Sequence, residues 1–131
     1  MNQSKGTILI ADDKKIVREP LMAYLAMDFP DYNVIEVTSG MNLERRLKEG
    51  LENTPLVILD NHMPPGPFGS ELIKQYAAKY NGGTSFILFY GDDDDSIGEQ
   101  AVRDGAVAFY KKPGDMNVIM GKAKEVIGNN S

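Results

Sequence analysis

The stretch Thr7–Asp13 reads TILIADD, an unbroken apolar run that ends directly at two acidic residues. Four more short apolar runs follow it along the chain. The five runs are Thr7–Ala11 (TILIA), Asn33–Val37 (NVIEV), Pro55–Leu59 (PLVIL), Ser85–Tyr90 (SFILFY) and Val107–Tyr110 (VAFY). The first, third and fourth are apolar throughout, which is typical of strands covered on both faces. These runs therefore predict the middle of a parallel sheet.

Segments with helical periodicity separate the apolar runs. Leu72, Ile73 and Tyr76, for example, fall on one face of a helix. Strict alternation of strands and helices predicts an α/β fold with right-handed crossovers and helices on both faces of the sheet. Pro20 interrupts the first helical segment, where it predicts a kink or a late start. The pattern Ser96-x-x-Glu99 predicts a capping box at the start of the fourth helix.

The composition limits the classes of protein to which the chain can belong. Its 131 residues predict one domain, with 42% hydrophobic and 25% charged residues. It has no cysteine and only one histidine, His62, so disulfides, thiolate sites and multi-histidine zinc sites are excluded. A net charge of −5 argues against direct binding of nucleic acid. Without a signal-like start or an apolar run of roughly 20 residues, we expect no membrane contact and a cytoplasmic location.

Charged residues follow three of the predicted strands. Asp12 and Asp13 come after the first strand, Asp60 after the third, and Lys111 and Lys112 after the fifth. The carboxyl ends of parallel strands share one edge of the sheet, so the three carboxylates should converge there. Three anions in one crevice repel each other unless a cation offsets them. A divalent cation bound through oxygen, together with a lysine, is the natural solution, and such a crevice can receive a phosphoryl group.

Four pieces of the chain resemble the receiver domain of two-component response regulators, over nearly its whole length. They are ILIADD at Ile8–Asp13, LVILDNHMP at Leu56–Pro64, RDGAVAF at Arg103–Phe109 and YKKP at Tyr110–Pro113. The resemblance implies a doubly wound, five-stranded parallel sheet in the order 2-1-3-4-5, a flavodoxin-like three-layer sandwich. It also implies a single domain over residues 1–131, with a core of about 6–128 and no output domain.

The resemblance implies a role for each matching position. Asp60 would be the phosphoacceptor, and Lys112 would pair with the phosphoryl oxygens. Mg2+ or Mn2+ would be bound by Asp13, by Asp60 and by the backbone carbonyl of His62, with Asp12 holding it through water. The remaining positions would line the site: Gly91, Met63, Pro64 and Pro113, the last after a cis bond.

Tyr90 departs from the family pattern, which has Thr or Ser at the end of the fourth strand. A tyrosine carries its hydroxyl several Å further from the backbone, so it cannot make the same contact with a phosphoryl group. In one interpretation Tyr90 packs outward and the switch works without it. In the other, the signal is weak, altered or independent of phosphate. Phe109 matches the aromatic residue that moves with the switch, but it also suits an ordinary half-buried strand position.

Three further features lie beside the predicted site. The loop Pro64–Gly69 (PPGPFG) is one residue longer than usual, which we interpret as a harmless insertion. The run Asp92–Asp95 is interpreted as a solvated loop whose last members favour the start of a helix. The side chain of His62 is expected at the rim of the site, where it would affect the access of water.

These expectations combine into one functional interpretation with two alternatives. The chain would receive a phosphoryl group from a histidine kinase or a histidine phosphotransfer protein. It would then signal to a downstream protein or a second copy through the face made by the fourth helix, fifth strand and fifth helix. It would not be an enzyme with a separate substrate. The first alternative is a phosphorylation-independent pseudo-receiver that acts as an interaction module. The second is a small magnesium-dependent phosphohydrolase, against which stands the lack of a second acid/base carboxylate near Asp60.

Overall fold

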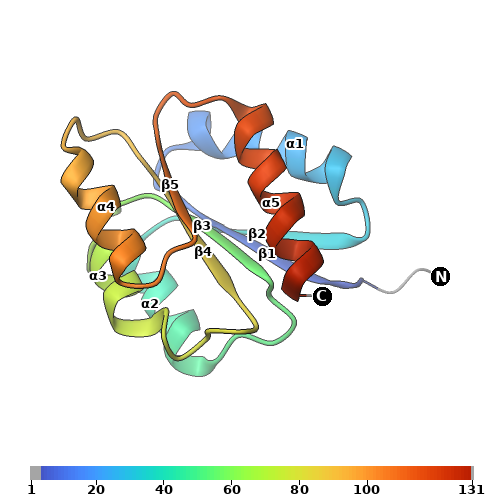
Figure 1. Cartoon of the computed structure of the whole chain (residues 1–131), viewed down its shortest axis with the longest axis horizontal. Helices are drawn as coiled ribbons and strands as arrows, with labels where there is room; N and C mark the ends of the chain where they lie inside the picture. Colours follow the sequence, from blue (N-terminus) through green and yellow to red (C-terminus); the bar gives the residue numbers. More distant parts are fainter. Residues whose placement is uncertain (1–3, 131) are drawn as a thin grey trace.

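The five strands form one parallel sheet in the order β2-β1-β3-β4-β5, as predicted (Figure 1). The computed structural model describes residues 4–130, and the side chains of residues 4–128. Residues 1–3 and 131 of the predicted domain lie outside this described part. The strands are β1 (Gly6–Ala11), β2 (Tyr32–Val37), β3 (Leu56–Leu59), β4 (Ser85–Tyr90) and β5 (Ala108–Lys111). The helices are α1 (Lys15–Asp28), α2 (Gly40–Glu49), α3 (Gly69–Tyr76), α4 (Asp95–Arg103) and α5 (Met116–Asn130).

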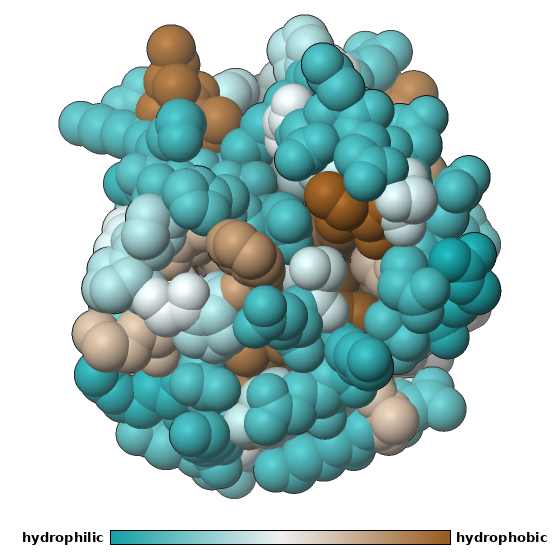
Figure 2. Space-filling model, turned by 90° about the vertical axis from the view of Figure 1, so that its left-hand side faces the viewer, coloured by the Kyte–Doolittle hydropathy of each residue, from teal (hydrophilic) through white to brown (hydrophobic). Residues whose placement is uncertain are grey.

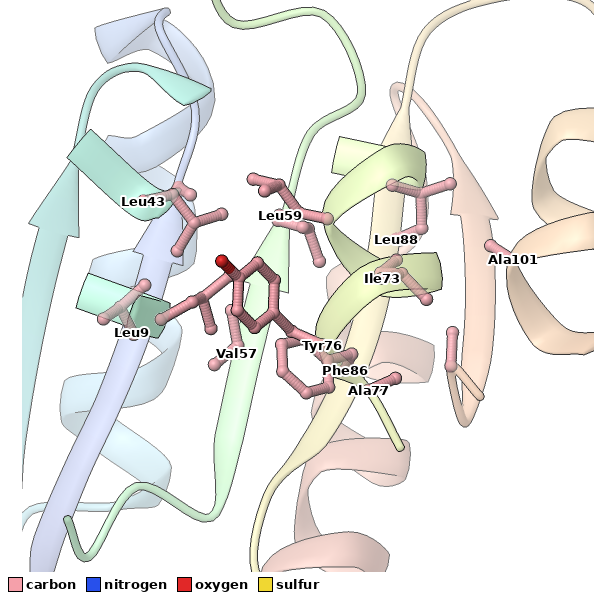
Figure 3. Close-up of a cluster of buried hydrophobic side chains, with 14 of the residues drawn as sticks. Leu9, Leu43, Val57, Leu59, Ile73, Tyr76, Ala77, Phe86, Leu88 and Ala101 are labelled. Atoms are coloured by element: carbon pink, nitrogen blue, oxygen red, sulfur yellow. The ribbon is translucent and has the colours of Figure 1, made fainter. Parts of the chain in front are cut away.

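The helices cover both faces of the sheet. Helices α1 and α5 lie on one face, and α2, α3 and α4 lie on the other (Figure 1). Successive residues of a strand point to opposite faces, so a fully buried strand must be apolar at every position. In β3, Leu56 and Ile58 pack beneath α1 and α5, while Val57 and Leu59 face the other helices (Figure 3). The apolar runs are therefore continuous because helices cover both faces of these strands, as inferred from the sequence.

The starts of two helices differ from the local predictions. Helix α1 begins at Lys15 and runs through Pro20, so the late start is excluded and a kink at Pro20 stays a prediction. The capping box at Ser96 is also absent, because Asp94 is the N-cap of α4 and its side chain accepts a hydrogen bond from the Ser96 N–H. An aspartate is as good an N-cap as a serine, so the sequence left two residues competing for this place.

No helix in the described part of the chain combines the length and the apolar character needed to cross a bilayer.

Candidate functional site

Three of the predicted site residues, Asp12, Asp60 and Lys112, stand one position beyond their strands, where the backbone is still bonded to the neighbouring strand. The Asp12 N–H donates to the Val37 carbonyl at 3.0 Å, and the Asp60 N–H donates to the Ala11 carbonyl at 2.9 Å. At the other side of the sheet, the Lys112 N–H donates to the Tyr90 carbonyl at 2.8 Å. The sheet therefore fixes the starting point of each side chain. This carboxyl edge faces the viewer in Figure 2, which shows a mostly hydrophilic surface with separate small hydrophobic patches.

Lys112 joins the two most buried carboxylates of the site. Its Nζ lies 2.7 Å from Asp12 Oδ2 and 3.2 Å from Asp60 Oδ2. Asp12 is 2% exposed and Asp60 is 6% exposed, so solvent screens these contacts weakly. Buried charges are stable only when they are paired, and one ammonium group here serves two carboxylates.

Asp60 holds its proton more tightly than an ordinary carboxyl group. Burial is the main cause that raises its pKa, and the negative charge of Asp12 is the second. The ammonium group of Lys112 and a hydrogen bond from the Asn61 N–H to Asp60 Oδ1, 2.8 Å long, act in the opposite direction. The site therefore carries more negative charge than Lys112 alone offsets.

The acidic cluster fits a hard divalent cation. Asp12, Asp13 and Asp60 each offer one carboxylate oxygen, and these oxygens lie within 4.8 Å of one another. Asp13 Oδ1 is buried without a hydrogen bond, since Lys14 Nζ is 3.6 Å away. A buried carboxylate oxygen with no donor is an unfavourable arrangement that a bound cation relieves. The three aspartates are therefore the residues that would hold Mg2+.

Gly91 and Pro113 lie beside Lys112. Lys112 directly follows β5, and its side chain crosses β4 to reach the carboxylates; its Nζ lies 5.8 Å from the centre of the Phe89 ring. A Cβ atom at Gly91 would lie 3.8 Å from Lys112 Cδ, so a much larger side chain would obstruct this path. The peptide bond between Lys112 and Pro113 is cis.

Tyr90 and Phe109 are not part of this cluster, because their side chains lie on the opposite face of the sheet among the residues beneath α2, α3 and α4. The Tyr90 side chain is 0% exposed, so the interpretation in which it packs outward is wrong. Its ring lies 6.2 Å from that of Phe109. The Phe109 ring in turn lies against Gly98 of α4, where a Cβ atom would be only 2.1 Å from Phe109 Cδ2.

The Tyr90 hydroxyl is inserted into the first hydrogen bond of α4. It accepts a hydrogen bond from the Gly98 N–H at 3.0 Å and donates one to the Asp94 carbonyl at 2.7 Å. In the other four helices, the N–H of the fourth residue donates directly to the carbonyl of the residue before the helix. In α2, for example, the Leu43 N–H donates to the Ser39 carbonyl. A side chain inserted in this way ties the start of a helix to whatever carries that side chain. Here it ties α4 to the end of β4.

The acidic run Asp92–Asp95 is an exposed loop whose last two members, Asp94 and Asp95, form the start of α4, as interpreted from the sequence. Asp94 caps the helix, and its two hydrogen bonds from Ser96 lower its pKa. Asp95 Oδ1 lies 2.9 Å from Lys111 Nζ, and this contact raises the pKa of Lys111. Lys111 Nζ also lies 5.3 Å from the centre of the Tyr90 ring. Lys111 and Lys112 thus have partners on opposite faces of the sheet.

The remaining predicted residues lie in the loop after β3. His62 is exposed, and its ring is 5.6 Å from the Phe68 ring. Met63 is buried in the core beneath α2 and α3, and its carbonyl accepts a hydrogen bond from the Gly40 N–H. Pro64 is exposed, and its bond to Pro65 is also cis. The carbonyl of Pro65 accepts a hydrogen bond from Met41. The loop thus supplies acceptors to the first turn of α2.

Asn61 contacts the site and was missed by the sequence analysis. It follows Asp60 directly and bonds both to the Asp60 carboxylate and to the first turn of α3. An asparagine shortly before a Pro/Gly-rich loop and a helix start was the available signal, because its side chain readily caps backbone N–H groups.

Comparisons with known proteins agree with this geometry. The model of the response regulator receiver domain family matches residues 8–124. The chain resembles a CheY-like receiver domain protein from Methanospirillum hungatei JF-1, with a TM-score of 0.80, 22% identity and 97% of each chain covered. A receiver domain protein from Clostridium thermocellum gives a TM-score of 0.80 at 20% identity, with 94% of each chain covered.

One curated relative is a protein of Thermotoga maritima named cyclic di-GMP phosphodiesterase. It is 30% identical to the chain over 123 residues, which are 94% of this chain and 31% of that protein. The chain therefore spans about a third of its relative's length.

Proposed function

Since the chain belongs to the response regulator receiver domain family, we propose that it accepts a phosphoryl group on Asp60 in a magnesium-dependent reaction. The observation that supports this most strongly is the position of Lys112 Nζ between Asp12 and Asp60, in a cluster of aspartates to which Asp13 also belongs. Three carboxylates, paired with the ammonium group of Lys112 and the exposed one of Lys14, still leave an excess of negative charge that suits a divalent cation. Receiver domains are in general signalling modules without an outside substrate, and we propose the same for this chain.

The chemistry requires one bond to form as another breaks. A carboxylate oxygen of Asp60 attacks the phosphorus atom, while the bond from phosphorus to the donor's leaving atom breaks and its electron pair leaves with the donor. Such transfers depend mainly on positioning and on neutralising charge. Lys112 is already 3.2 Å from Asp60 and needs only a small shift to contact a phosphoryl oxygen. A magnesium ion held by the three aspartates would supply further positive charge to those oxygens.

Receiver domains exchange phosphoryl groups with histidine kinases or phosphotransfer proteins and act on downstream effectors. We propose a phosphohistidine of such a protein as the natural donor, and small acyl phosphates as substitutes for it. For the output we propose the face formed by α4, β5 and α5, which would contact a downstream protein or a second copy. The phosphodiesterase activity in the relative's name is not proposed for this chain, which matches only 31% of that protein.

We further propose that the response to phosphorylation is altered by Tyr90. A small hydroxyl residue at this position could turn toward a phosphoryl group, whereas the Tyr90 hydroxyl is committed to Gly98 and Asp94. This contact supports a second candidate function, a module that binds its partner through α4 whether or not Asp60 is phosphorylated. The two candidates differ in whether α4 changes when Asp60 is modified.

The proposed function is tested by incubating the protein with acetyl phosphate and Mg2+ and measuring its intact mass. We expect the mass of one phosphoryl group to be added, and no addition when EDTA removes the Mg2+, because the three aspartates otherwise lack an offsetting charge. An unmodified mass under both conditions, together with an unchanged NMR spectrum after addition of beryllium fluoride, would refute phosphoryl acceptance and leave the interaction module.

Tyr90→Phe tests the altered response separately. Without the hydroxyl, α4 must close its first turn by itself, so we expect a loss of about 1 kcal/mol in the free energy of unfolding, measured in urea. The rate of phosphorylation should stay unchanged, because Tyr90 lies on the other face of the sheet. We expect the α4 amide NMR shifts to respond more strongly to beryllium fluoride in Tyr90→Phe than in the wild type.

Tyr110→Phe is the matched control, since it removes a hydroxyl from the neighbouring strand β5. It should leave the α4 amides as they are in the wild type. If wild-type α4 already responds as strongly as α4 in Tyr90→Phe, the Tyr90 hydroxyl does not restrain the helix.

A further inference from the structure

Asn61 connects the carboxylate of Asp60 to helix α3. Its backbone N–H donates to Asp60 Oδ1 at 2.8 Å, while Asp60 Oδ2 faces Lys112. These two contacts, one at each oxygen, set the rotation of the carboxylate. One of them comes from a peptide group whose own direction must be fixed by other contacts.

The other polar groups of Asn61 fix that direction. Its backbone carbonyl accepts a hydrogen bond from the Gly69 N–H at 2.8 Å, and its side-chain Oδ1 accepts one from the Ser70 N–H at 2.9 Å. Gly69 and Ser70 are the first two residues of α3, and the N-cap of this helix, Phe68, has no side-chain acceptor. The first N–H groups of a helix need acceptors from outside it, and Asn61 provides two of them from eight and nine residues upstream.

The start of α3 packs against Asp60 with no space for a further atom. A Cβ atom at Gly69 would lie 2.0 Å from the Asp60 carbonyl oxygen and 3.3 Å from Asn61 Cα. The first residue of the helix therefore packs directly on the peptide group that links Asp60 to Asn61. A change in the direction of this peptide group would turn the Asn61 N–H, and with it the carboxylate that it holds.

We propose that Asn61 is a positioning residue for phosphoryl transfer to Asp60: by capping α3 it aims its backbone N–H at the Asp60 carboxylate. This proposal rests on the proposed function, because it concerns the same acceptor. It assigns Asn61 no contact with the phosphoryl group. Its effect is expected in the rate of transfer, which depends on alignment of the attacking oxygen with the donor, and not in the binding of the donor.

The test compares Asn61→Ala and Asn61→Asp in the full chain, with acetyl phosphate and Mg2+. We expect Asn61→Ala to lower the maximal rate of phosphorylation by about tenfold, since misalignment acts on the reacting step. The half-saturating concentration of acetyl phosphate should change by less than about twofold. Asn61→Asp restores an acceptor that caps helices as well as asparagine, so most of the lost rate should return. Asn33→Ala, the same substitution on the exposed side of β2, should behave as the wild type.

Two results would overturn the proposal. One is a wild-type maximal rate in Asn61→Ala. The other is an Asn61→Asp variant as slow as Asn61→Ala, because the loss would then not pass through the cap of α3. If Asn61→Ala does not fold, Asn61→Gln moves the acceptor by one methylene group and serves in its place.

Amide hydrogen exchange separates this proposal from the proposed function. Exchange at residue 61 and Ser70 should be faster by about tenfold in Asn61→Ala, because both N–H groups lose alignment with their acceptors. This measurement needs no phosphorylation. A wild type that takes no phosphoryl group refutes the proposed function, whereas unchanged exchange in Asn61→Ala refutes the positioning role.

Discussion

Replacing Asp60 by asparagine is expected to abolish the phosphoryl adduct and, in the absence of Mg2+, to raise the free energy of unfolding by about 1 kcal/mol. The first effect follows because an amide does not attack an acyl phosphate. The second follows because the ionised carboxylate of Asp60 is buried and lies near the negative charge of Asp12, the two causes that raise its pKa. Asparagine removes one charge and leaves Lys112 paired with Asp12 at 2.7 Å. Loss of function and gain of stability should therefore occur in one variant.

The gain in stability should depend on pH in a defined direction. Because the pKa of Asp60 is higher in the folded than in the unfolded protein, the folded state binds more protons between these two values. The contribution of Asp60 to wild-type stability therefore falls as pH rises through this range, and the advantage of Asp60→Asn is largest above the folded pKa. The advantage should shrink toward acidic pH, where Asp60 is protonated in both states.

Urea unfolding of the two proteins at several pH values measures this difference. Asp93→Asn, which removes an exposed carboxylate outside the cluster, is the control and should show a much smaller gain. Saturating Mg2+ should remove the advantage, because a ligand at 100 times its Kd stabilises the folded wild type by about 2.7 kcal/mol. An Asp60→Asn protein less stable than the wild type without Mg2+ would contradict the charge argument.

Gly98→Ala is expected to destabilise the protein by about 2 kcal/mol, although alanine is the better helix former. A Cβ atom at this position would lie 2.1 Å from Phe109 Cδ2 and 2.2 Å from Phe109 Cγ. Either the ring must move or α4 must separate from β5, and the second movement also strains the Gly98 hydrogen bond to Tyr90. The packing of α4 against β5 in the proposed output face therefore requires a glycine at position 98.

Gly121→Ala in α5 provides a matched control, because a Cβ atom there would meet no atom within 4 Å. It should stabilise the protein by up to about 1 kcal/mol, the usual advantage of alanine over glycine in a helix. The two substitutions are chemically identical, so opposite signs isolate the contact with Phe109. In a Phe109→Ala background the cost of Gly98→Ala should largely disappear, which a double-mutant cycle measures. Equal changes in the free energy of unfolding at the two glycines would show that the Phe109 ring moves aside at little cost, which would contradict this prediction.

The sequence predicted the sheet and the acidic cluster because both depend on local patterns. Continuous apolar runs mark covered strands, and parallel strands bring their carboxyl ends to one edge, so Asp12, Asp13 and Asp60 converge whatever the loops do. The end of the fifth strand offered both Lys111 and Lys112, and the resemblance to receiver domains singled out Lys112. None of these inferences required knowledge of a side-chain conformation.

The parts that escaped prediction depend on contacts between distant residues. The inward position of Tyr90 is accompanied by a hydrogen bond from Gly98, eight residues later and on another element. The capping role of Asn61 requires α3 to begin beside it after a loop of particular shape. Asp94 and Ser96 were both acceptable N-caps, and only packing of the helix decided between them. A pattern within one element cannot contain such information.

The last strand repeats each type of side chain twice, since Phe109 and Tyr110 are followed by Lys111 and Lys112. A shift of β5 by one residue against β4 would exchange the faces of all four side chains and still present an aromatic ring and a lysine on each side. A shift that brought Lys111 to the position of Lys112 would put Ala108, and not an aromatic ring, in the position of Phe109 beside Gly98. The close fit of the Phe109 ring at Gly98 selects one of these two registers. One glycine of α4 thereby also determines which of two adjacent lysines serves Asp60.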